Sequence, residues 1–458
     1  MVLWENRASL ASRDRFAEQG SRYEDFEDRM ALCLENIIAS WETRHAALRL
    51  KRENTQAFLD AVQHVLKRGT LPNAAYANIA CKLMQRISEA HDQLPMSLFI
   101  SGVHDPDQYP TFSGGFADVY RASYNGKRVA LKRIRTFTSE LTNPRRMKFC
   151  REALVWQGLR HPFLIPFLGI DRHSFPSSFC MVSPWMKHGT ILKFLADHLQ
   201  NGWEKRMTLE IAQGLHYLHS MNIVHGDLEG CNILVTDDAH ACLSDFGLAT
   251  IIHERDPYMT STVMIPGADR AGSSRWTAPE LFVPEQFGCD KFVKTRASDV
   301  YAFAYVCIEV SLPPFSERHA DCSDHDFAPQ LETGKVPFVE LTEIQVMFNI
   351  IRGIRPERPE TMADRMYELV TEAWAADFRD RPDTMRITRL LEELPANESR
   401  CLVPRRQRFD MFRVGSGALD STDSESESDS ESVKSDSESV QSRALTDSDH
   451  TDPEEVEF

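Results

Sequence analysis

The sequence lacks the features of a secreted or membrane-embedded chain. Its ten cysteines form no C-x-x-C pair and no secretory leader is recognisable, so neither a disulfide scaffold nor a paired-cysteine zinc site is expected. The longest apolar run, Val300–Ile308, has about half the length of a bilayer span and is closed by Glu309. We therefore expect a reduced, intracellular and cytoplasmic protein without a membrane span, with a nuclear location left open.

Little net charge remains in the body of the chain once its last segment is set aside. The formal charge is −16, but residues 420–458 hold 14 acidic and 2 basic side chains, which leaves 54 acidic and 50 basic side chains in residues 1–419. A nearly neutral body has no global field that attracts nucleic acid, so no nucleic-acid partner is expected. The 458 residues allow two to three domains.

Residues 1–95 have the pattern of a helical region. Apolar side chains recur first at steps of three and four: Phe26, Met30, Leu34, Ile37 and Trp41. A second helix is expected from a cap at Thr55 to Gly69, and a third over 73–91, ending before Pro95. Two interpretations stay open: a bundle packed on the next part of the chain, or an element that makes regulatory or dimerising contacts.

The remainder divides into a strand-rich part, a helical part and a polar tail. Short β-rich runs such as 128–132 begin near Pro110, and helical patterns dominate after Gly189. This order predicts an α+β protein with a small β-rich lobe before a larger helical one. Residues 415–458 interleave Ser with Asp and Glu and are predicted to be disordered. The tail suits phosphorylation by acidophilic kinases or simple solubilisation, and both interpretations stay open.

An ordered series of motifs carries the chemistry. The motifs are FSGGFADV at 112–119, VALK at 129–132, HGDLEGCN at 225–232, DFG at 245–247 and APE at 278–280. This series resembles the eukaryotic protein kinase domain. Gly230, the stretch 272–280 and the RPERP sequence at 355–359 are similar to the tyrosine-kinase-like serine/threonine group, particularly to its fungal expansion. The resemblance implies the two-lobed protein kinase fold over 105–395, with an N-lobe at 105–186 and a C-lobe at 187–395.

The resemblance implies an ATP-dependent protein kinase that uses Mg²⁺ and phosphorylates Ser or Thr of protein substrates. Lys132 would contact the α- and β-phosphates, fixed by Glu152 on the next helix. Asp227 would be the catalytic base, and Asn232 and Asp245 would hold the metal, since their side chains carry the oxygen ligands that Mg²⁺ prefers.

The same resemblance assigns the nucleotide pocket. Gly114 and Gly115 belong to the glycine-rich loop over the phosphates. Val119, Ala130 and Leu234 would line the adenine ring. Ser183 falls at the gatekeeper position, and the backbone of Pro184, Trp185 and Met186 would form the hinge.

Further matches concern architecture and specificity. Glu280 and Arg381 correspond to a buried ion pair that anchors the activation segment, and Asp299 to a helix residue that supports the catalytic loop. Ser273 occupies the position from which serine/threonine kinases contact the catalytic Asp. The loop DLEGCN also lacks the AAR or RAA pattern of tyrosine kinases, which favours Ser/Thr.

Three departures lie within the motifs. Phe112 and Ala117 stand at the first and third glycine positions of the phosphate loop. Gly226 replaces the arginine before the catalytic Asp, which predicts activity independent of activation-loop phosphorylation. Glu229 replaces the lysine that meets the γ-phosphate, which removes one charge-assisted contact. The alternative is therefore a pseudokinase or scaffold that binds nucleotide or partners without efficient transfer.

A fourth departure is an insertion at about 312–332, rich in His, Asp, Ser and Pro. Asp321, His325 and Asp326 allow a metal site, but the composition favours a solvated loop. Retained non-coding sequence is a further interpretation.

Overall fold

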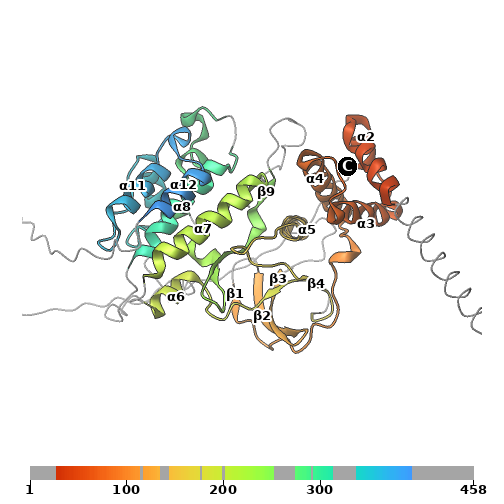
Figure 1. The fold of residues 1–458 in the computed structure, drawn as a ribbon, viewed down its shortest axis with the longest axis horizontal. Helices are drawn as coiled ribbons and strands as arrows, with labels where there is room; N and C mark the ends of the chain where they lie inside the picture. Colours follow the sequence, from red (N-terminus) through yellow and green to blue (C-terminus); the bar gives the residue numbers. More distant parts are fainter. Residues whose placement is uncertain are drawn as a thin grey trace, which may run out of the picture. The chain divides into compact units, whose positions relative to one another are not determined.

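The structure is a computed structural model that describes residues 27–113, 117–134, 144–175, 178–198, 202–251, 274–289, 292–312 and 337–394. Gly114, Gly115, Ser273, nearly all of the predicted insertion and the whole acidic tail lie outside the described residues. The predictions made for them stay predictions. For the described part, the predicted α+β class with a β-rich lobe and a helical lobe is confirmed (Figure 1).

The N-lobe is built on one five-stranded antiparallel sheet with the order β1-β2-β3-β5-β4. Its strands are β1 (Phe112–Ser113), β2 (Ala117–Tyr124), β3 (Lys127–Ile134), β4 (Gly169–Asp171) and β5 (Cys180–Pro184). Asn125 and Gly126 join β2 to β3 with φ of 50° and 72°, the two positive values that a tight hairpin turn requires. This turn fixes the register that pairs Val119 with Lys132.

The C-lobe is mainly helical. Its helices are α6 (Ile191–Asp197), α7 (Trp203–Ser220), α8 (Arg296–Ser311), α10 (Glu343–Ile351), α11 (Asp364–Ala373) and α12 (Thr384–Glu393). Helix α8 begins with a capping box between Thr295 and Ser298 and is buried from Ser298 to Val310. The longest apolar run of the sequence is therefore the central core helix of this lobe. In the described part of the chain, no helix has both the length and the apolar character that crossing a bilayer requires.

Two short antiparallel pairs position the motif segments. β6 (Ile223–Val224) pairs with β9 (Thr250–Ile251), and β7 (Ile233–Val235) pairs with β8 (Ala241–Leu243). The segment 225–232 therefore leaves β6 and enters β7, while Asp245 comes directly after β8. Because the four strands hold both segments at their ends, the HGDLEGCN and DFG motifs lie next to each other.

The N-terminal region is helical, as predicted, with boundaries that differ in part. Residues 27–39 are helical, followed by α2 (Trp41–Ala47), α3 (Arg52–Arg68) and α4 (Ala74–His91). Gly69 ends α3 with φ of 66°, and the Asn73 side chain caps α4 by accepting from the Tyr76 N–H at 3.1 Å. Both ends match the sequence signals.

Two details of this region were predicted wrongly. The cap at Thr55 is wrong because α3 starts at Arg52, and the fully buried Thr55 hydroxyl instead donates to the Lys51 carbonyl at 3.1 Å. The end of the predicted stripe at Trp41 is also wrong. Leu34 is buried, and Met30 and Ile37 pack partly buried on the core, but the helix ends before Ser40 and Trp41 is 49% exposed. Ala31 and Ile38 are buried as well, so the packed face of this helix is wider than the predicted stripe.

Helix α4 packs on α5 (Pro144–Trp156), the helix that carries Glu152, and α3 packs on α4 (Figure 1). The Gln63 and Gln157 amides exchange two hydrogen bonds of 2.6 and 2.9 Å. Arg151 on α5 forms an ion pair with Glu89 on α4 at 3.0 Å, and Arg146 forms one with Asp92 at 2.7 Å. Of the two open interpretations, the contacts favour a bundle packed on the N-lobe.

Candidate active site

Lys132 on β3 stands at the junction of three elements. Its Nζ lies 2.7 Å from Glu152 Oε1 on α5 and 2.7 Å from Asp245 Oδ1 after β8. The predicted pair of Lys132 and Glu152 is therefore formed. The contact with Asp245 is an additional bond that ties the N-lobe sheet to the C-lobe motif.

The opposite charges of Lys132 and Asp245 favour each other's ionised forms, while burial opposes the ionised form of Glu152. Burial lowers the pKa of Lys132, but the carboxylates of Asp245 and Glu152 outweigh it and raise that pKa well above its usual range. Burial raises the pKa of Asp245, yet the Lys132 ammonium and the Gly247 N–H bring it below its ordinary value. Glu152 is more deeply buried, and desolvation leaves its pKa raised despite Lys132. A cation between two carboxylates results.

The segment around Asp245 has the conformation that turns its carboxylate toward Lys132. Asp245 has φ of 57°, and its side chain accepts from the Gly247 N–H at 3.2 Å. The next residue, Phe246, is fully buried, with its ring centroid 5.8 Å from that of Trp156 on α5. Packing of Phe246 under α5 keeps Asp245 on the Lys132 side.

Asp227 and Asn232 lie together in the segment between β6 and β7. Asn232 Nδ2 donates to the Asp227 backbone carbonyl at 2.8 Å, which directs its amide across the loop. The Ser244 N–H and hydroxyl both donate to the Asn232 carbonyl at 2.9 Å, and Ser244 directly precedes Asp245. The structure thus brings Asp227, Asn232 and Asp245 to one place.

Asp299 supports this loop from the core, as predicted. Its carboxylate accepts from the backbone N–H groups of His225 and Gly226, each at 2.8 Å, and contacts His219 Nε2 at 2.9 Å. Because Asp299 sits in the first turn of α8, these bonds fix the loop backbone to the buried core helix of the lobe.

Glu309 gives a second support that the sequence analysis did not assign. Its Oε2 accepts from the Gly230 N–H at 3.0 Å and from Trp276 Nε1 at 2.8 Å, so it joins the loop to the segment at 274–276. Burial raises the pKa of Glu309 to about 8, although the bond from Trp276 opposes this. The sequence signal for this role was the position of Glu309 directly after the apolar run Val300–Ile308. A carboxylate at the end of a buried run needs buried hydrogen-bond partners.

The assigned adenine-pocket residues share one face of the N-lobe sheet. Val119 is paired with Lys132, and Ala130 with Ser183, so register and alternation place all four side chains on the same face. Ser183 is buried and small. Leu234 lies on β7 of the C-lobe, and its place across from this face of the sheet stays a prediction.

The hinge offers one N–H group for a ligand. Pro184 has none, and the Trp185 N–H donates to the Arg128 carbonyl at 3.1 Å. Within the described residues no intramolecular acceptor is found for the Met186 N–H. The Trp185 ring instead stacks on Phe112, with centroids 6.2 Å apart. Trp185 thus supports β1 through Phe112, the residue that stands where the resemblance would place a glycine.

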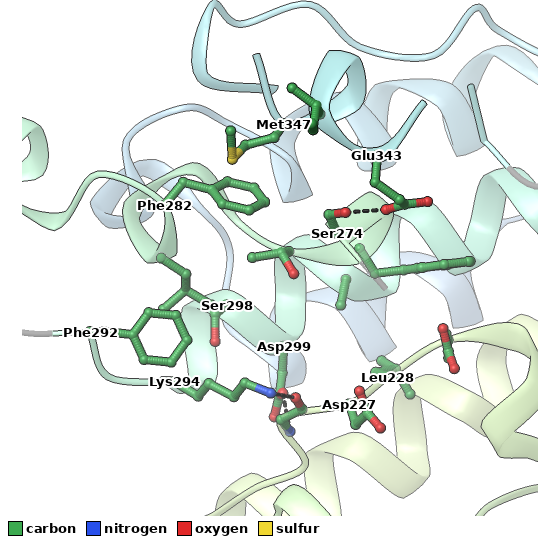
Figure 2. A pocket seen from close by; sticks show the side chains of 17 residues that line it. Asp227, Leu228, Ser274, Phe282, Phe292, Lys294, Ser298, Asp299, Glu343 and Met347 are labelled. Atoms are coloured by element: carbon green, nitrogen blue, oxygen red, sulfur yellow. Dashed lines mark hydrogen bonds between the residues drawn. The ribbon is translucent and has the colours of Figure 1, made fainter. Parts of the chain in front are cut away.

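A cavity of about 280 Å³ opens next to Asp227 in the C-lobe (Figure 2). Phe282, Phe292 and Met347 line one side, and Asp227, Glu229 and Lys294 line the other. The cavity lies beside Asp227, and Lys132 is not among the residues that line it.

Glu229 is a half-buried carboxyl in this cavity. Burial, with a further contribution from the Asp227 carboxylate, raises the pKa of Glu229 to about 7, while a bond from Cys231 lowers it. Burial also raises the pKa of Asp227, and Lys294 opposes that shift. The site therefore holds a carboxyl that changes charge near neutral pH where the family usually has a cation.

The predicted ion pair of Glu280 and Arg381 is confirmed. The guanidinium makes two bonds to the carboxylate, of 2.7 and 2.8 Å, and a third of 3.0 Å to the Ala297 carbonyl at the start of α8. Removing one partner of such a buried pair typically costs about 3–5 kcal/mol, so these are stability positions.

The residues fit a magnesium nucleotide. Mg²⁺ is commonly held by one or two carboxylates with phosphate oxygens and water, and Asn232 with Asp245 offers oxygens of this kind. No cluster of three His, Cys, Asp or Glu side chains suited to a metal occurs in the described parts of the chain. Such an arrangement suits a metal that arrives with a phosphate ligand better than a resident protein-only site.

Comparisons with known proteins agree with this geometry. Residues 112–391 match the family described as protein tyrosine and serine/threonine kinase. Among relatives, serine/threonine-protein kinase STY46 of Arabidopsis thaliana is 26% identical over 288 residues, covering 62% of this chain and 43% of the relative. Ephrin type-A receptor 1 of Homo sapiens is 30% identical over 290 residues, covering 62% of this chain and 26% of the receptor.

The shared part is the region that carries the motifs, and the chain spans less than half the length of these two relatives. The matched family region contains Lys132, Glu152, Asp227, Asn232 and Asp245. It makes up more than half of the chain. The chain therefore belongs to the protein tyrosine and serine/threonine kinase family.

Proposed function

We propose that this protein transfers the γ-phosphate of Mg-ATP to Ser or Thr residues of protein substrates. The observation that carries the proposal is Lys132, whose Nζ lies 2.7 Å from both Glu152 and Asp245. This ion pair spans the two lobes and is the arrangement in which a lysine can hold phosphates next to a metal ligand. Asp227 and Asn232 lie at the adjoining loop.

Each residue has one part in the transfer. Lys132 would neutralise the α- and β-phosphates, and the Met186 N–H would receive the adenine. A metal bound by Asn232 and Asp245 would neutralise charge on the β- and γ-phosphates. Asp227 would accept the proton of the acceptor hydroxyl as its oxygen bonds to the γ-phosphorus. The bond from that phosphorus to the bridging oxygen then breaks, and ADP leaves with the electron pair.

Choice of Ser or Thr rests on the loop sequence, DLEGCN, which lacks the tyrosine-kinase pattern. The relatives include proteins named as serine/threonine kinases and proteins named as tyrosine kinases, so names alone leave specificity open. Phosphoamino-acid analysis of labelled substrate tests this point. Phosphoserine or phosphothreonine is expected, and phosphotyrosine alone would contradict the proposal.

A second candidate function is that of a pseudokinase or scaffold that binds nucleotide or partners without efficient transfer, with partner binding that does not depend on nucleotide. Glu229 favours it, because a half-buried carboxyl at the position of the usual lysine opposes the charge of the transferring group. The scaffold predicts partner binding that is unchanged when Lys132 is replaced by Met.

The test is incorporation of label from γ-labelled ATP by the full chain with Mg²⁺ and a general protein substrate. Wild type should incorporate label and Asp227→Asn should not. Asp237→Asn is a matched control, since Asp237 is exposed on the β7–β8 turn. Equal incorporation by wild type and Asp227→Asn would show that the label comes from elsewhere and would overturn the proposal.

We further propose that residues 1–95 form a region that holds α5 in place for a kinase domain at 105–395. The two amide bonds between Gln63 and Gln157 and the ion pair of Glu89 with Arg151 support this role. The Glu89 pair joins α4 to α5 next to Glu152, and the Gln63 bonds join α3 to Gln157, the residue that follows α5. A regulatory contact within one chain accounts for these bonds without dimerisation.

A further inference from the structure

The segment that holds Asp227 contains no lysine or arginine. Between His225 and Asn232, Gly226 stands where the family usually has arginine and Glu229 where it has lysine. Two positive charges are therefore missing next to the proposed base. In their place stands a carboxyl whose pKa lies near neutrality, so the local charge is more negative than phosphoryl transfer favours.

Lys294 enters this space from a different part of the chain. It lies in the loop before α8, five residues ahead of Asp299, and lines the cavity together with Asp227 and Glu229. Its ammonium donates a hydrogen bond to the Gly226 carbonyl. Figure 2 shows the side chain extended from its loop toward Asp227 and Asp299.

Gly226 and the side chain of Lys294 pack closely against each other. A Cβ at Gly226 would lie 3.1 Å from Lys294 Cδ and 2.8 Å from the Leu248 carbonyl oxygen, and Gly226 has φ of +76°. A side chain at position 226 would therefore crowd the stem of Lys294 as well as strain the backbone. Gly226, which stands in place of the usual arginine, therefore leaves room for the side chain of Lys294.

The charge of Lys294 acts on Asp227. Burial raises the pKa of Asp227, and Lys294 gives the largest effect in the opposite direction. The charged and titratable groups that face Asp227 are His225, Glu229 and Cys231 in its own segment, Asp245 after β8, Lys148 on α5, and Lys294. Of the two lysines in this set, Lys294 lines the cavity and Lys148 does not.

We propose that Lys294 is a positioning residue that holds the catalytic loop through the Gly226 carbonyl and supplies, beside Asp227, the positive charge that this loop lacks. This inference rests on the proposed kinase function. It does not require Lys294 to touch the nucleotide, since its ammonium is engaged by the Gly226 carbonyl. The ammonium acts on the reaction through the loop that it holds and through its own charge in the cavity.

The test compares Lys294→Met with Lys294→Arg in the full chain, using kcat and the KM for ATP. We expect Lys294→Met to lower kcat about tenfold or more while the KM for ATP stays within about twofold, because the lost charge acts in the transfer step. Lys294→Arg keeps the charge and should keep most of the wild-type kcat.

Two further variants separate charge from folding. Lys127→Met, at the exposed first residue of β3, is the matched control and should behave as wild type. Adding Glu229→Lys to Lys294→Met returns a cation to the loop and should recover kcat. Recovery supports the inference even if Lys294→Met loses thermal stability.

A kcat of Lys294→Met within about twofold of wild type would overturn the inference. An equal loss of kcat in Lys294→Met and Lys294→Arg, with no recovery on adding Glu229→Lys, would also overturn it, since only a structural role gives that result. Failure of the kinase proposal looks different, because wild type itself would then transfer no more label than Asp227→Asn.

Discussion

The two halves of the site differ in how closely they keep the charges of the kinase family. On the N-lobe side, Lys132 lies between Glu152 and Asp245 with both distances at 2.7 Å. On the C-lobe side, the loop around Asp227 has lost two cations and gained Glu229. The nucleotide half is thus conventional, and the transfer half is altered.

The halves also differ in what supports them. Helix α5 is held from outside by α3 and α4, through bonds such as Arg151 with Glu89. The loop at 225–232 is held from inside by Asp299 and Glu309 at the two ends of the buried core of α8. Support by a buried helix keeps the loop geometry although its charges have changed. Nucleotide binding should therefore be ordinary, while the rate of transfer should depend on charges peculiar to this chain.

The largest effect is expected from Lys132→Met, which breaks the conventional half. Removing the ammonium leaves Glu152 and Asp245 facing each other without a cation, and the phosphates lose their contact. We expect kcat to fall about 10²–10³-fold and the affinity for Mg-ATP to fall with it. Steady-state kinetics and a thermal-shift titration measure the two quantities, with Lys127→Met as control. Unchanged Mg-ATP affinity would contradict the account of this half.

A smaller effect is expected from Glu229→Gln, which sharpens the contrast in the altered half. The pKa of Glu229 is about 7, so wild type gains a carboxylate beside Asp227 as the pH rises through neutrality. Gln stays neutral. The ratio of mutant to wild-type kcat should rise from about one at pH 6 to about threefold at pH 8.5, since only the ionised form opposes transfer. A ratio independent of pH would exclude this role for Glu229.

The smallest effect is expected at the outer support of α5. Arg151→Glu places two like charges where the ion pair with Glu89 was and should loosen α5. Partly exposed pairs contribute about 0.2–1 kcal/mol, so a change of about twofold to threefold in kcat is expected. The double variant Arg151→Glu, Glu89→Arg should restore kcat. Equal activities of the single and double variants would argue against a positioning role for α4.

Motifs in the sequence were sufficient for much of the fold and for the set of site residues. Short motifs predicted the lobe order, the pair of Lys132 with Glu152 and the pair of Glu280 with Arg381, because each motif fixes both a residue type and its element. Gly69 and Asn73 marked helix ends correctly, since a positive φ and a side-chain cap leave local signals.

The remaining features depend on contacts between distant segments. Lys294 has no motif of its own, and its position beside Gly226 results from folding the loop before α8 against a loop 68 residues earlier. The cap at Thr55 was predicted wrongly because burial, rather than local preference, decides where that threonine lies. The exposure of Trp41 could not be predicted while the break of the helix at Ser40 was unknown.

The most direct test of a conventional binding half joined to an altered transfer half is the Asp227→Asn variant, assayed for both functions in the same preparation. Saturating Mg-ATP at about 100 times its Kd should stabilise both wild type and variant by about 2.7 kcal/mol in thermal unfolding. Label transfer should be present in wild type and absent in the variant. Equal transfer by both proteins, or no stabilisation of either by millimolar Mg-ATP, would contradict the account.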